Sequence, residues 1–299
     1  MRALRLHSEE KGLDFESAVG DFPEDCRFRN LSPRTIEWYR YSLGPFVRFL
    51  ADRGSTAVDA VTEAVLRAFL VERASQVGPR RVNHYRGTLL RLFAWLEDQA
   101  RIDHNPAQEV PKLREPQKLV PTFTADELDR LLAQPDPRGF LGLRDRVLML
   151  LLLDTGMRLS EALGLRLDDL DFETATMRVL GKGRKDRIVG LSADLSQQLR
   201  RYLQRRQAAL ADIGRPTCPW LLPNHNGGKA GPKTFQTPLR RYASLAGITR
   251  VRVSPHTFRH TFAVWFVRHG GSPFHLQKIL GHSSLDMSRR YCELNSPSG

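Results

Sequence analysis

The sequence predicts a mainly α-helical protein with a small β-sheet, an α+β fold divided into two domains. Apolar residues recur at helical spacing through most of the 299-residue chain. Two short segments, 176–180 and 187–191, instead have the pattern of β-strands joined by a turn. Four prolines between residues 106 and 121 disfavour helix there and mark a boundary. A chain of this length can bury two cores, so we expect one domain on each side of the boundary.

The first domain is expected over residues 23–105, after a polar, partly acidic extension of residues 1–22. Ser32 and Pro33 are typical of a helix start, because serine caps free N–H groups and proline suits the first turn. Another helix is predicted over residues 79–98, with apolar residues along one face. Its other positions carry arginines, which are Arg80, Arg81, Arg86 and Arg91. The pattern indicates a small helical module with a basic surface, on which we expect these arginines to bind an anionic partner.

Residues 106–121 are predicted to form an extended linker, and the second domain is expected over residues 122–299. That domain opens with a capping box, in which Thr124 and Glu127 satisfy each other's backbone N–H groups. Gly156 follows a largely apolar helix and is typical of a helix end. After the two strands, the pattern predicts a long helix and then shorter ones at about residues 233–246, 255–269, 273–280 and 284–291.

The charge balance favours a polyanionic partner. Lys and Arg together number 46 against 33 acidic residues, which gives a formal net charge of +13. Such an excess raises association with DNA, RNA or anionic lipid. Arginine outnumbers lysine, which suits bidentate contacts to phosphate. The alternative explanation of the arginine content is a protein from a high-GC genome.

Two further patterns bear on location. No apolar stretch is long enough to span a bilayer, and the first ten residues are charged. The three cysteines, Cys26, Cys218 and Cys292, are scattered and form no CxxC pair. We therefore expect a cytoplasmic protein with no membrane partner.

Arg158 is the first candidate for chemistry. It follows the apolar helix and the Gly156 turn, a place from which a side chain can point into a cleft. Glu161 lies three residues further on and is expected to brace the guanidinium. The alternative is an ordinary surface ion pair, which contributes little.

A basic turn between the two strands is the second candidate. The segment 181–187 is rich in glycine and cations, and its charged residues include Lys182, Arg184, Lys185 and Arg187. A hairpin tip of this kind can lie beside a phosphate backbone, and a lysine on it can give a proton to a leaving oxygen. The alternative is a solvated turn.

The third candidate is a helix start that carries His256, Arg259 and His260. The spacing i, i+3 and i+4 places these side chains on one face near the helix N-terminus, where anions are favoured. The alternative is a set of ordinary core or surface histidines. A zinc hydrolase would need a glutamate directly after His256, and that residue is Thr257.

The fourth candidate joins His282, which follows Gly281, to Tyr291 nine residues later. Taken alone, such a tyrosine is more typical of packing. The four candidates together provide what attack on a phosphodiester needs, namely positive charge on the non-bridging oxygens, a nucleophile, a base and an acid. Tyr291, His256 and Lys182 fit the last three tasks. No carboxylate cluster for Mg²⁺ and no Walker-type loop is present in the sequence, so we expect no metal and no other cofactor.

The set of motifs, in this order, resembles the tyrosine site-specific recombinases, the phage-integrase family that includes the Xer-like resolvases. The resemblance covers about residue 24 to Tyr291 and both predicted domains. One departure is Met287-Ser288, where that family often has two threonines. The resemblance implies a C-shaped clamp on DNA, in which a helical core-binding domain and a catalytic domain grip opposite faces.

The resemblance also implies roles. Tyr291 attacks the scissile phosphate and forms a 3′-phosphotyrosyl bond, while Lys182 protonates the leaving 5′-oxygen. Arg158 and Arg259 hold the non-bridging oxygens. The remaining members assist: His256 helps proton transfer, His282 hydrogen-bonds the phosphate, Glu161 supports Arg158, and His260 has a structural or supporting part.

The implied partner is double-stranded DNA with a specific recombination site, on which four identical protomers join two sites and a second recombinase can take part. Neither metal nor ATP is needed. Two other functions stay open, a type IB topoisomerase that relaxes DNA and a catalytically silent DNA-binding relative. The silent relative is expected to lack one of the charged residues, and none is missing.

Overall fold

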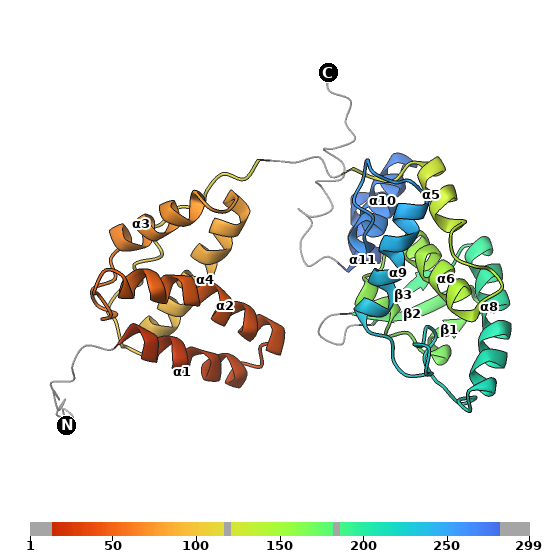
Figure 1. Ribbon diagram of the computed structural model, residues 1–299, viewed down its shortest axis with the longest axis horizontal. Helices are drawn as coiled ribbons and strands as arrows, with labels where there is room; N and C mark the ends of the chain where they lie inside the picture. Colours follow the sequence, from red (N-terminus) through yellow and green to blue (C-terminus); the bar gives the residue numbers. More distant parts are fainter. Residues whose placement is uncertain (1–13, 117–120, 182–185, 282–299) are drawn as a thin grey trace, which may run out of the picture. The chain divides into compact units, whose positions relative to one another are not determined.

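The computed structural model describes residues 14–116, 121–181 and 186–281. The chain forms two compact units, one up to residue 117 and the other from residue 118 (Figure 1). Helices dominate both units, and the only sheet in the described residues has three strands. The predicted fold class, mainly α with a small sheet, is therefore confirmed. Within the described part, no helix has both the length and the apolar character that a membrane crossing needs.

The described part of the first unit consists of four helices: α1 (Phe15–Phe28), α2 (Pro33–Ala51), α3 (Glu63–Ala74) and α4 (Pro79–Asp98). Ser32 caps α2 as predicted, because its hydroxyl accepts a hydrogen bond from the Thr35 backbone N–H. The four helices share one core of aromatic and aliphatic side chains. The ring of Phe46 on α2 is central there and lies 4.9 Å from that of Phe69 on α3.

Helix α1 corrects the predicted boundary of the first domain. Residues 1–22 were expected to be an extension, but α1 begins at Phe15 and its apolar face is buried. The apolar positions on this face recur at helical spacing and are Phe15, Ala18, Phe22 and Cys26. The polar and acidic composition of the segment as a whole makes that spacing hard to see in the sequence. The ring of Phe15 packs edge-on against Phe46 at 5.1 Å. The segment from residue 15 therefore belongs to the first core.

The segment after α4 corrects the predicted linker. Ala107 and Val110 lie within residues 106–121, yet both side chains are buried in the first core. The Arg86 guanidinium donates a hydrogen bond to the Val110 carbonyl, and Asn83 accepts one from the Leu113 N–H at 2.8 Å. The prolines do exclude helix, as predicted, but the chain over residues 106–115 packs against α4 instead of forming a free linker.

The second unit begins with α5 (Ala125–Leu132) and α6 (Phe140–Thr155) and continues through a short helix and a small sheet. The capping box predicted for Thr124 and Glu127 is present at the start of α5. The sheet is antiparallel with the order β1-β2-β3, and Thr176 pairs with Gly190 while Leu180 pairs with Asp186. Its elements are α7 (Leu159–Ala162), the 3-10 turn η1 (Leu167–Asp169), β1 (Leu170–Asp171), β2 (Thr176–Leu180) and β3 (Asp186–Gly190).

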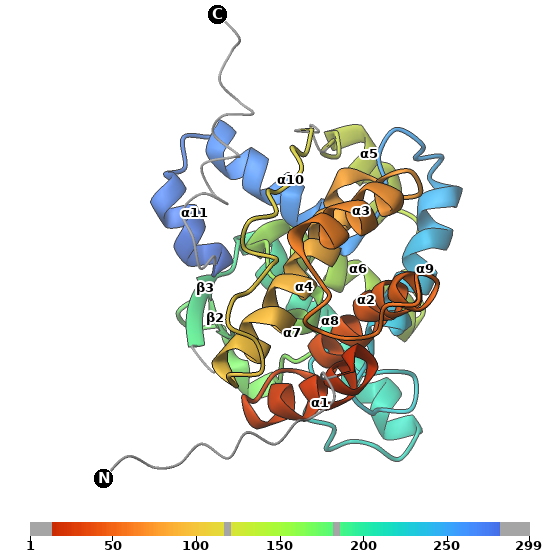
Figure 2. The same cartoon turned by 90° about the vertical axis from the view of Figure 1, so that its left-hand side faces the viewer.

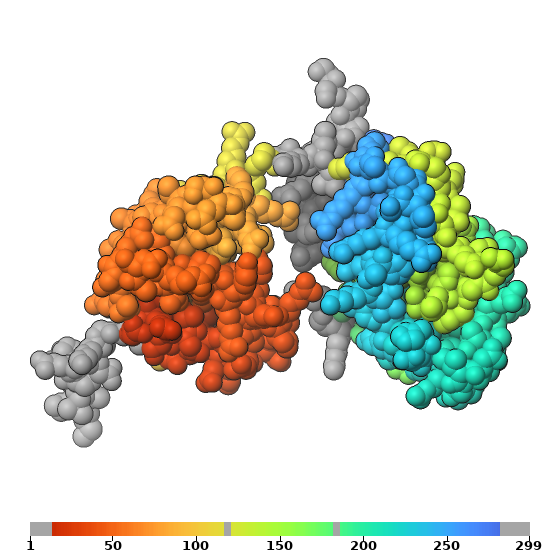
Figure 3. Space-filling view, viewed as in Figure 1, coloured from red at the N-terminus to blue at the C-terminus, as the bar shows by residue number. Residues whose placement is uncertain are grey.

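Four helices complete the described part of this unit: α8 (Ala193–Asp212), α9 (Pro232–Leu245), α10 (Pro255–Arg268) and α11 (Pro273–Leu280). Helix α8 is the long helix predicted after the strands, and α9, α10 and α11 agree with their predicted ranges within one residue at each end. The helix predicted at 284–291 lies outside the described residues. In both ribbon views α11 lies beside α10 and near β3 (Figures 1 and 2). Segments of α5, α8 and α9 form much of the face of this unit that Figure 3 shows.

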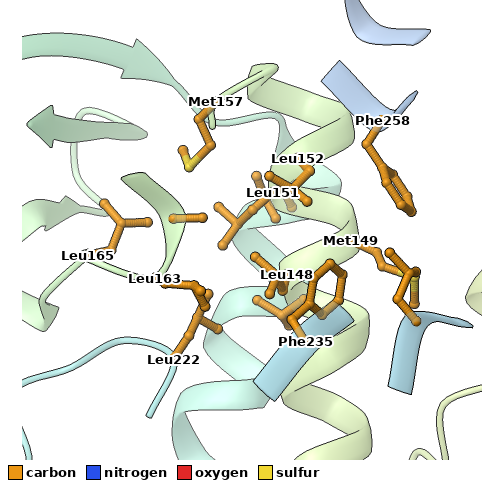
Figure 4. Packing of buried hydrophobic residues seen from close by; sticks show 14 of the residues in the cluster. Leu148, Met149, Leu151, Leu152, Met157, Leu163, Leu165, Leu222, Phe235 and Phe258 are labelled. Atoms are coloured by element: carbon orange, nitrogen blue, oxygen red, sulfur yellow. The ribbon is translucent and has the colours of Figure 1, made fainter. Parts of the chain in front are cut away.

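Helix α6 is the centre of the second core (Figure 4). Consecutive residues 147–149 and 151–152 are buried, so the helix contacts the core on several sides. Leu148, Leu151 and Leu152 are almost completely buried, and Phe235 from α9 and Phe258 from α10 pack against the same cluster. Because α6 is held in this core, the position of the turn that follows it, which begins at Gly156, is fixed as well.

Gly156 ends α6 in the left-handed conformation, with φ 61°. A Cβ atom at this position would lie 2.3 Å from the Phe262 ring and 2.7 Å from Leu280. Only glycine permits both the backbone turn and the close approach of α10 and α11.

We expect Gly156→Ala to lower the free energy of unfolding by at least about 3 kcal/mol, because left-handed strain and steric overlap add. Gly214→Ala is the matched control in the same unit, since Gly214 has φ 69° but no atom within 4 Å of an added Cβ. That control should cost only about 1 kcal/mol. Urea unfolding of both variants measures the difference. Equal losses of unfolding free energy would show that the close packing at Gly156 does not contribute to stability.

Candidate active site

The structure describes six of the residues predicted for chemistry or its support, namely Arg158, Glu161, Arg187, His256, Arg259 and His260. Five others, Lys182, Arg184, Lys185, His282 and Tyr291, lie outside the described residues. The described six come from α7 and the turn before it, from β3 and from α10.

Arg158 and Glu161 form the predicted brace. The Arg158 Nη1 donates to Glu161 Oε1 at 2.9 Å, and the Arg158 backbone N–H donates to Oε2, also at 2.9 Å. The Glu161 side chain is only 6% exposed, whereas that of Arg158 is 39% exposed. The carboxylate is therefore inside the protein, and the guanidinium that it holds is accessible from solvent.

Arg187 differs from the sequence prediction, which placed it on a hairpin tip as a DNA contact. Its side chain is 13% exposed, and Nη2 donates to Glu161 Oε2 at 2.7 Å. Its Nε donates to the Ile279 carbonyl of α11 at 2.8 Å. The reason is strand alternation, which puts Arg187 on the same inner face as buried Val189 while Ile188 points outward. That alternation was the available signal in the sequence.

Arg259 joins the ends of two helices. Its Nη1 donates to the Gly156 carbonyl at the end of α6, at 2.8 Å, and its Nη2 donates to the Leu280 carbonyl at the end of α11, at 2.9 Å. Helix C-termini leave carbonyls without intrahelical donors and carry partial negative charge, so a buried guanidinium suits them. Arg259 as a whole is only 8% exposed.

His256, Arg259 and His260 lie on α10 at the predicted spacing, and their exposure to solvent differs. His256 in the first turn is exposed, His260 is half-buried and Arg259 is buried. Ser254 caps the helix by accepting a hydrogen bond from the Thr257 N–H at 3.3 Å. Within the described ranges, no three His, Cys, Asp or Glu side chains are grouped so that they could hold a metal ion.

The Glu161 carboxyl is held in its ionised form. Burial alone raises the pKa of Glu161, but hydrogen bonds and charge from Arg187 and Arg158 outweigh burial and leave that pKa below its ordinary value. The cluster of Arg158, Arg187 and Glu161 therefore has a net charge of about +1. The Arg158 guanidinium is the solvent-accessible part of this cluster, so an anion can bind there.

The first unit carries a second candidate surface on α2 and α4. Arg80, Arg81 and Arg91 are exposed as the sequence predicted, but Arg86 is directed toward the Val110 carbonyl. The Arg81 Nη2 donates to the Tyr41 hydroxyl at 2.6 Å. This contact joins α4 to α2 and restrains one of the predicted cationic side chains.

An aromatic group next to Arg81 was missed by the sequence analysis. The ring of Trp38 lies 5.8 Å from that of Tyr41 and 5.6 Å from that of His84. Trp38 and Tyr41 are exposed large side chains. Arginines beside exposed rings suit a nucleic acid, because guanidinium groups bind phosphates and rings can contact bases and sugars. The grouping joins two helices, so spacing along one helix does not reveal it.

Comparison with known proteins gives a family match for each part of the chain. Residues 121–297 match the family described as "Phage integrase family", and residues 20–102 match "Phage integrase, N-terminal SAM-like domain". The chain is 33% identical over 264 residues to tyrosine recombinase XerC of Myxococcus xanthus, which covers 88% of each chain. It is 31% identical over 268 residues to tyrosine recombinase XerD of Lacticaseibacillus casei, which covers 90% of each.

Solved structures share the fold. The XerH site-specific recombinase bound to palindromic difH substrate, in a post-cleavage complex, superposes with a TM-score of 0.77 at 23% identity. The superposition covers 93% of this chain and 82% of that one. A lambda integrase tetramer bound to a Holliday junction gives a TM-score of 0.73 at 17% identity and covers 94% of this chain and 78% of that one.

The buried Glu161 carboxylate should stabilise the fold only where it is ionised. Its folded-state pKa lies below the ordinary 4.5. The stabilisation is therefore fully present above that ordinary value and is lost as the pH falls through the folded-state pKa. We expect Glu161→Gln to lower the urea midpoint clearly at about pH 7, and the difference from the unaltered protein to shrink at about pH 3, well below that ordinary value.

Asp126→Asn is the control for this experiment. Asp126 pairs with Arg130 on the surface, where its side chain is 79% exposed, and such pairs contribute little. Its urea midpoint should stay close to that of the unaltered protein at both pH values. A Glu161→Gln difference that does not change with pH would contradict the assignment of Glu161 as the ionised centre of the cluster.

Proposed function

This chain belongs to the phage integrase family and is a tyrosine recombinase that acts in site-specific DNA recombination, and from that premise we propose which of its residues perform strand exchange. The observation that carries the proposal is the accessible Arg158 guanidinium, held by the buried Glu161 carboxylate, which also pairs with Arg187. This arrangement offers fixed positive charge, which a phosphodiester needs when its non-bridging oxygens gain charge in the transition state.

The proposed reaction has two transesterification steps. The Tyr291 hydroxyl attacks the scissile phosphorus, its proton passes to a base, and the bond between phosphorus and the 5′-oxygen breaks. The products are a 3′-phosphotyrosyl bond and a 5′-hydroxyl, which receives its proton from Lys182. A 5′-hydroxyl from another strand then reverses these steps. One phosphoester replaces another at each step, so rejoining needs no ATP, and the proposed steps use no metal.

The other members of the site have supporting parts in this proposal. Arg158 and Arg259 neutralise the non-bridging oxygens, and the exposed His256 takes part in proton transfer. His282 donates a hydrogen bond to the phosphate. Glu161 fixes Arg158, as the hydrogen bonds between them support. His260 helps to hold α10 in place.

The proposed substrate is double-stranded DNA that contains a specific recombination site. The α2–α4 surface would contact the duplex through Arg80, Arg81 and Arg91, and the hairpin between β2 and β3 would add Arg184 and Lys185. Recombinases with this fold have been solved on DNA, including XerH on its difH substrate. We propose that a protein that acts on DNA in this way works in the cytoplasm.

The proposed working complex is a homo-tetramer on two DNA sites. Strand exchange needs two duplexes, each cut by one protomer on each strand, which gives four active sites. The lambda integrase tetramer on a Holliday junction supports this stoichiometry, since it has the same fold. A type IB topoisomerase would act as a monomer, and the Xer-like relatives do not favour that function.

We expect the unaltered protein to remain attached to DNA after denaturation in SDS, and Tyr291→Phe to leave no attached DNA while still binding it. The phenyl ring keeps the shape of the side chain but has no hydroxyl to form the phosphoester. The measurement uses sheared genomic DNA from the source organism, followed by sequencing of the attached ends. One recurring sequence supports a recombinase, whereas attachment by Tyr291→Phe would assign the nucleophile to another residue.

Phosphate contacts by α4 should appear in the salt dependence of DNA binding. We expect Arg80→Gln and Arg91→Gln each to weaken binding and to reduce the slope of log K against log[salt] by about 1. Arg67→Gln on α3 is the control, because Arg67 is exposed but paired with Glu63 at 2.5 Å. Unchanged slopes for both α4 variants would show that this helix does not face the DNA.

A further inference from the structure

Glu161 is shared by two arginines that have different surroundings. Its Oε1 accepts from Arg158, and its Oε2 accepts from both the Arg158 backbone and Arg187. Arg158 is accessible from solvent, and its Nε and Nη2 have no hydrogen-bond partner among residues 14–116, 121–181 and 186–281. Arg187 is turned inward and uses its Nε and Nη2 on Ile279 and Glu161. Only one of the two guanidinium groups is thus directed toward a possible substrate.

The shared carboxylate has an electrostatic consequence. An Arg158–Glu161 pair by itself would be neutral, and a neutral pair attracts a phosphate weakly. With Arg187 on the second carboxylate oxygen, the three groups have a net charge of about +1. The field at the accessible guanidinium therefore stays positive although its partner is a buried anion.

The shared carboxylate also has a geometric consequence. If Arg187 is removed, Oε2 keeps only the backbone N–H of Arg158 as a donor and is free to attract the Arg158 guanidinium. A two-point contact with one carboxylate is the preferred geometry of arginine, and it would turn the guanidinium toward Glu161. Arg187 prevents this by donating its own hydrogen bond to Oε2. Its other contact, to the Ile279 carbonyl, fixes it to the end of α11.

We propose that Arg187 is a positioning residue for strand cleavage, which acts through Glu161 to keep the Arg158 guanidinium oriented and open toward the scissile phosphate. This inference rests on the proposed function, in which Arg158 binds that phosphate. It replaces the role of a DNA contact that the sequence suggested for Arg187. Lysine cannot replace it fully, because one ammonium group lacks the planar fork that reaches both Glu161 and Ile279.

The test is a double-mutant cycle on the single-turnover rate of strand cleavage. In the unaltered protein, Arg187→Met should slow cleavage by about 100-fold, the loss expected when a group in contact with substrate is misplaced. In an Arg158→Lys background the same change should slow cleavage by less than about 3-fold, since the group that it positions is already altered. Affinity for the uncut site should change by less than about 3-fold in both backgrounds.

Arg178→Met is the matched control. Arg178 lies on the neighbouring strand β2 and pairs with Asp169 at 3.0 Å, but its side chain is 54% exposed and does not contact Glu161. Its loss should slow cleavage by less than about 3-fold. This control distinguishes the effect on the cleavage rate of losing the arginine at Glu161 from the effect of losing an ion pair that only supports the sheet.

Three outcomes would overturn the inference: an unchanged rate for Arg187→Met, an equal slowing in both Arg158 backgrounds, or a loss of DNA affinity as large as the loss of rate. Should Arg187→Met not fold, the same cycle with Arg187→Lys decides, with an expected slowing of about 10-fold that again depends on Arg158. Failure of the proposed function is distinguishable, because the unaltered protein and Arg178→Met would then form no attached DNA either.

Discussion

The carboxylate of Glu161 is the constraint on which the rest of the site depends. A buried charge is costly unless it is paired and hydrogen-bonded, and here two arginines and a backbone N–H meet that need. The arginines come from the turn before α7 and from β3, so the pairing fixes these two elements against each other. Arginine suits this task because its planar fork can satisfy an acceptor on one side and remain available on another.

Packing brings the elements to this point. Helix α6 supplies many of the buried apolar side chains at the centre of the second core, so its C-terminal end is fixed. Gly156 turns the chain there, and its carbonyl accepts from Arg259, which also binds the carbonyl of Leu280. The ends of α6 and α11 thus converge on one guanidinium, close in the fold to the Glu161 cluster. Substrate-binding groups are held by the same contacts that stabilise the unit.

Local chemistry explains how much could be predicted from the sequence. The caps at Ser32 and Thr124, the helix end at Gly156 and the Arg158–Glu161 contact all lie within a few residues, where periodicity and spacing are informative. The contact of Arg187 with Glu161 joins residues far apart in the chain, and the Trp38 group joins two helices. Such pairings depend on tertiary packing. The helix that begins at Phe15 was missed for another reason, because its acidic residues masked a buried face.

The most direct test of the account is a crystal structure of the protein on its DNA site, trapped before cleavage. The account predicts that an Arg158 nitrogen lies about 3 Å from a non-bridging oxygen of the scissile phosphate, while Arg187 remains on Glu161 and Ile279 and does not contact DNA. A structure in which Arg187 binds the phosphate, or in which Glu161 pairs with Arg158 alone, would contradict it.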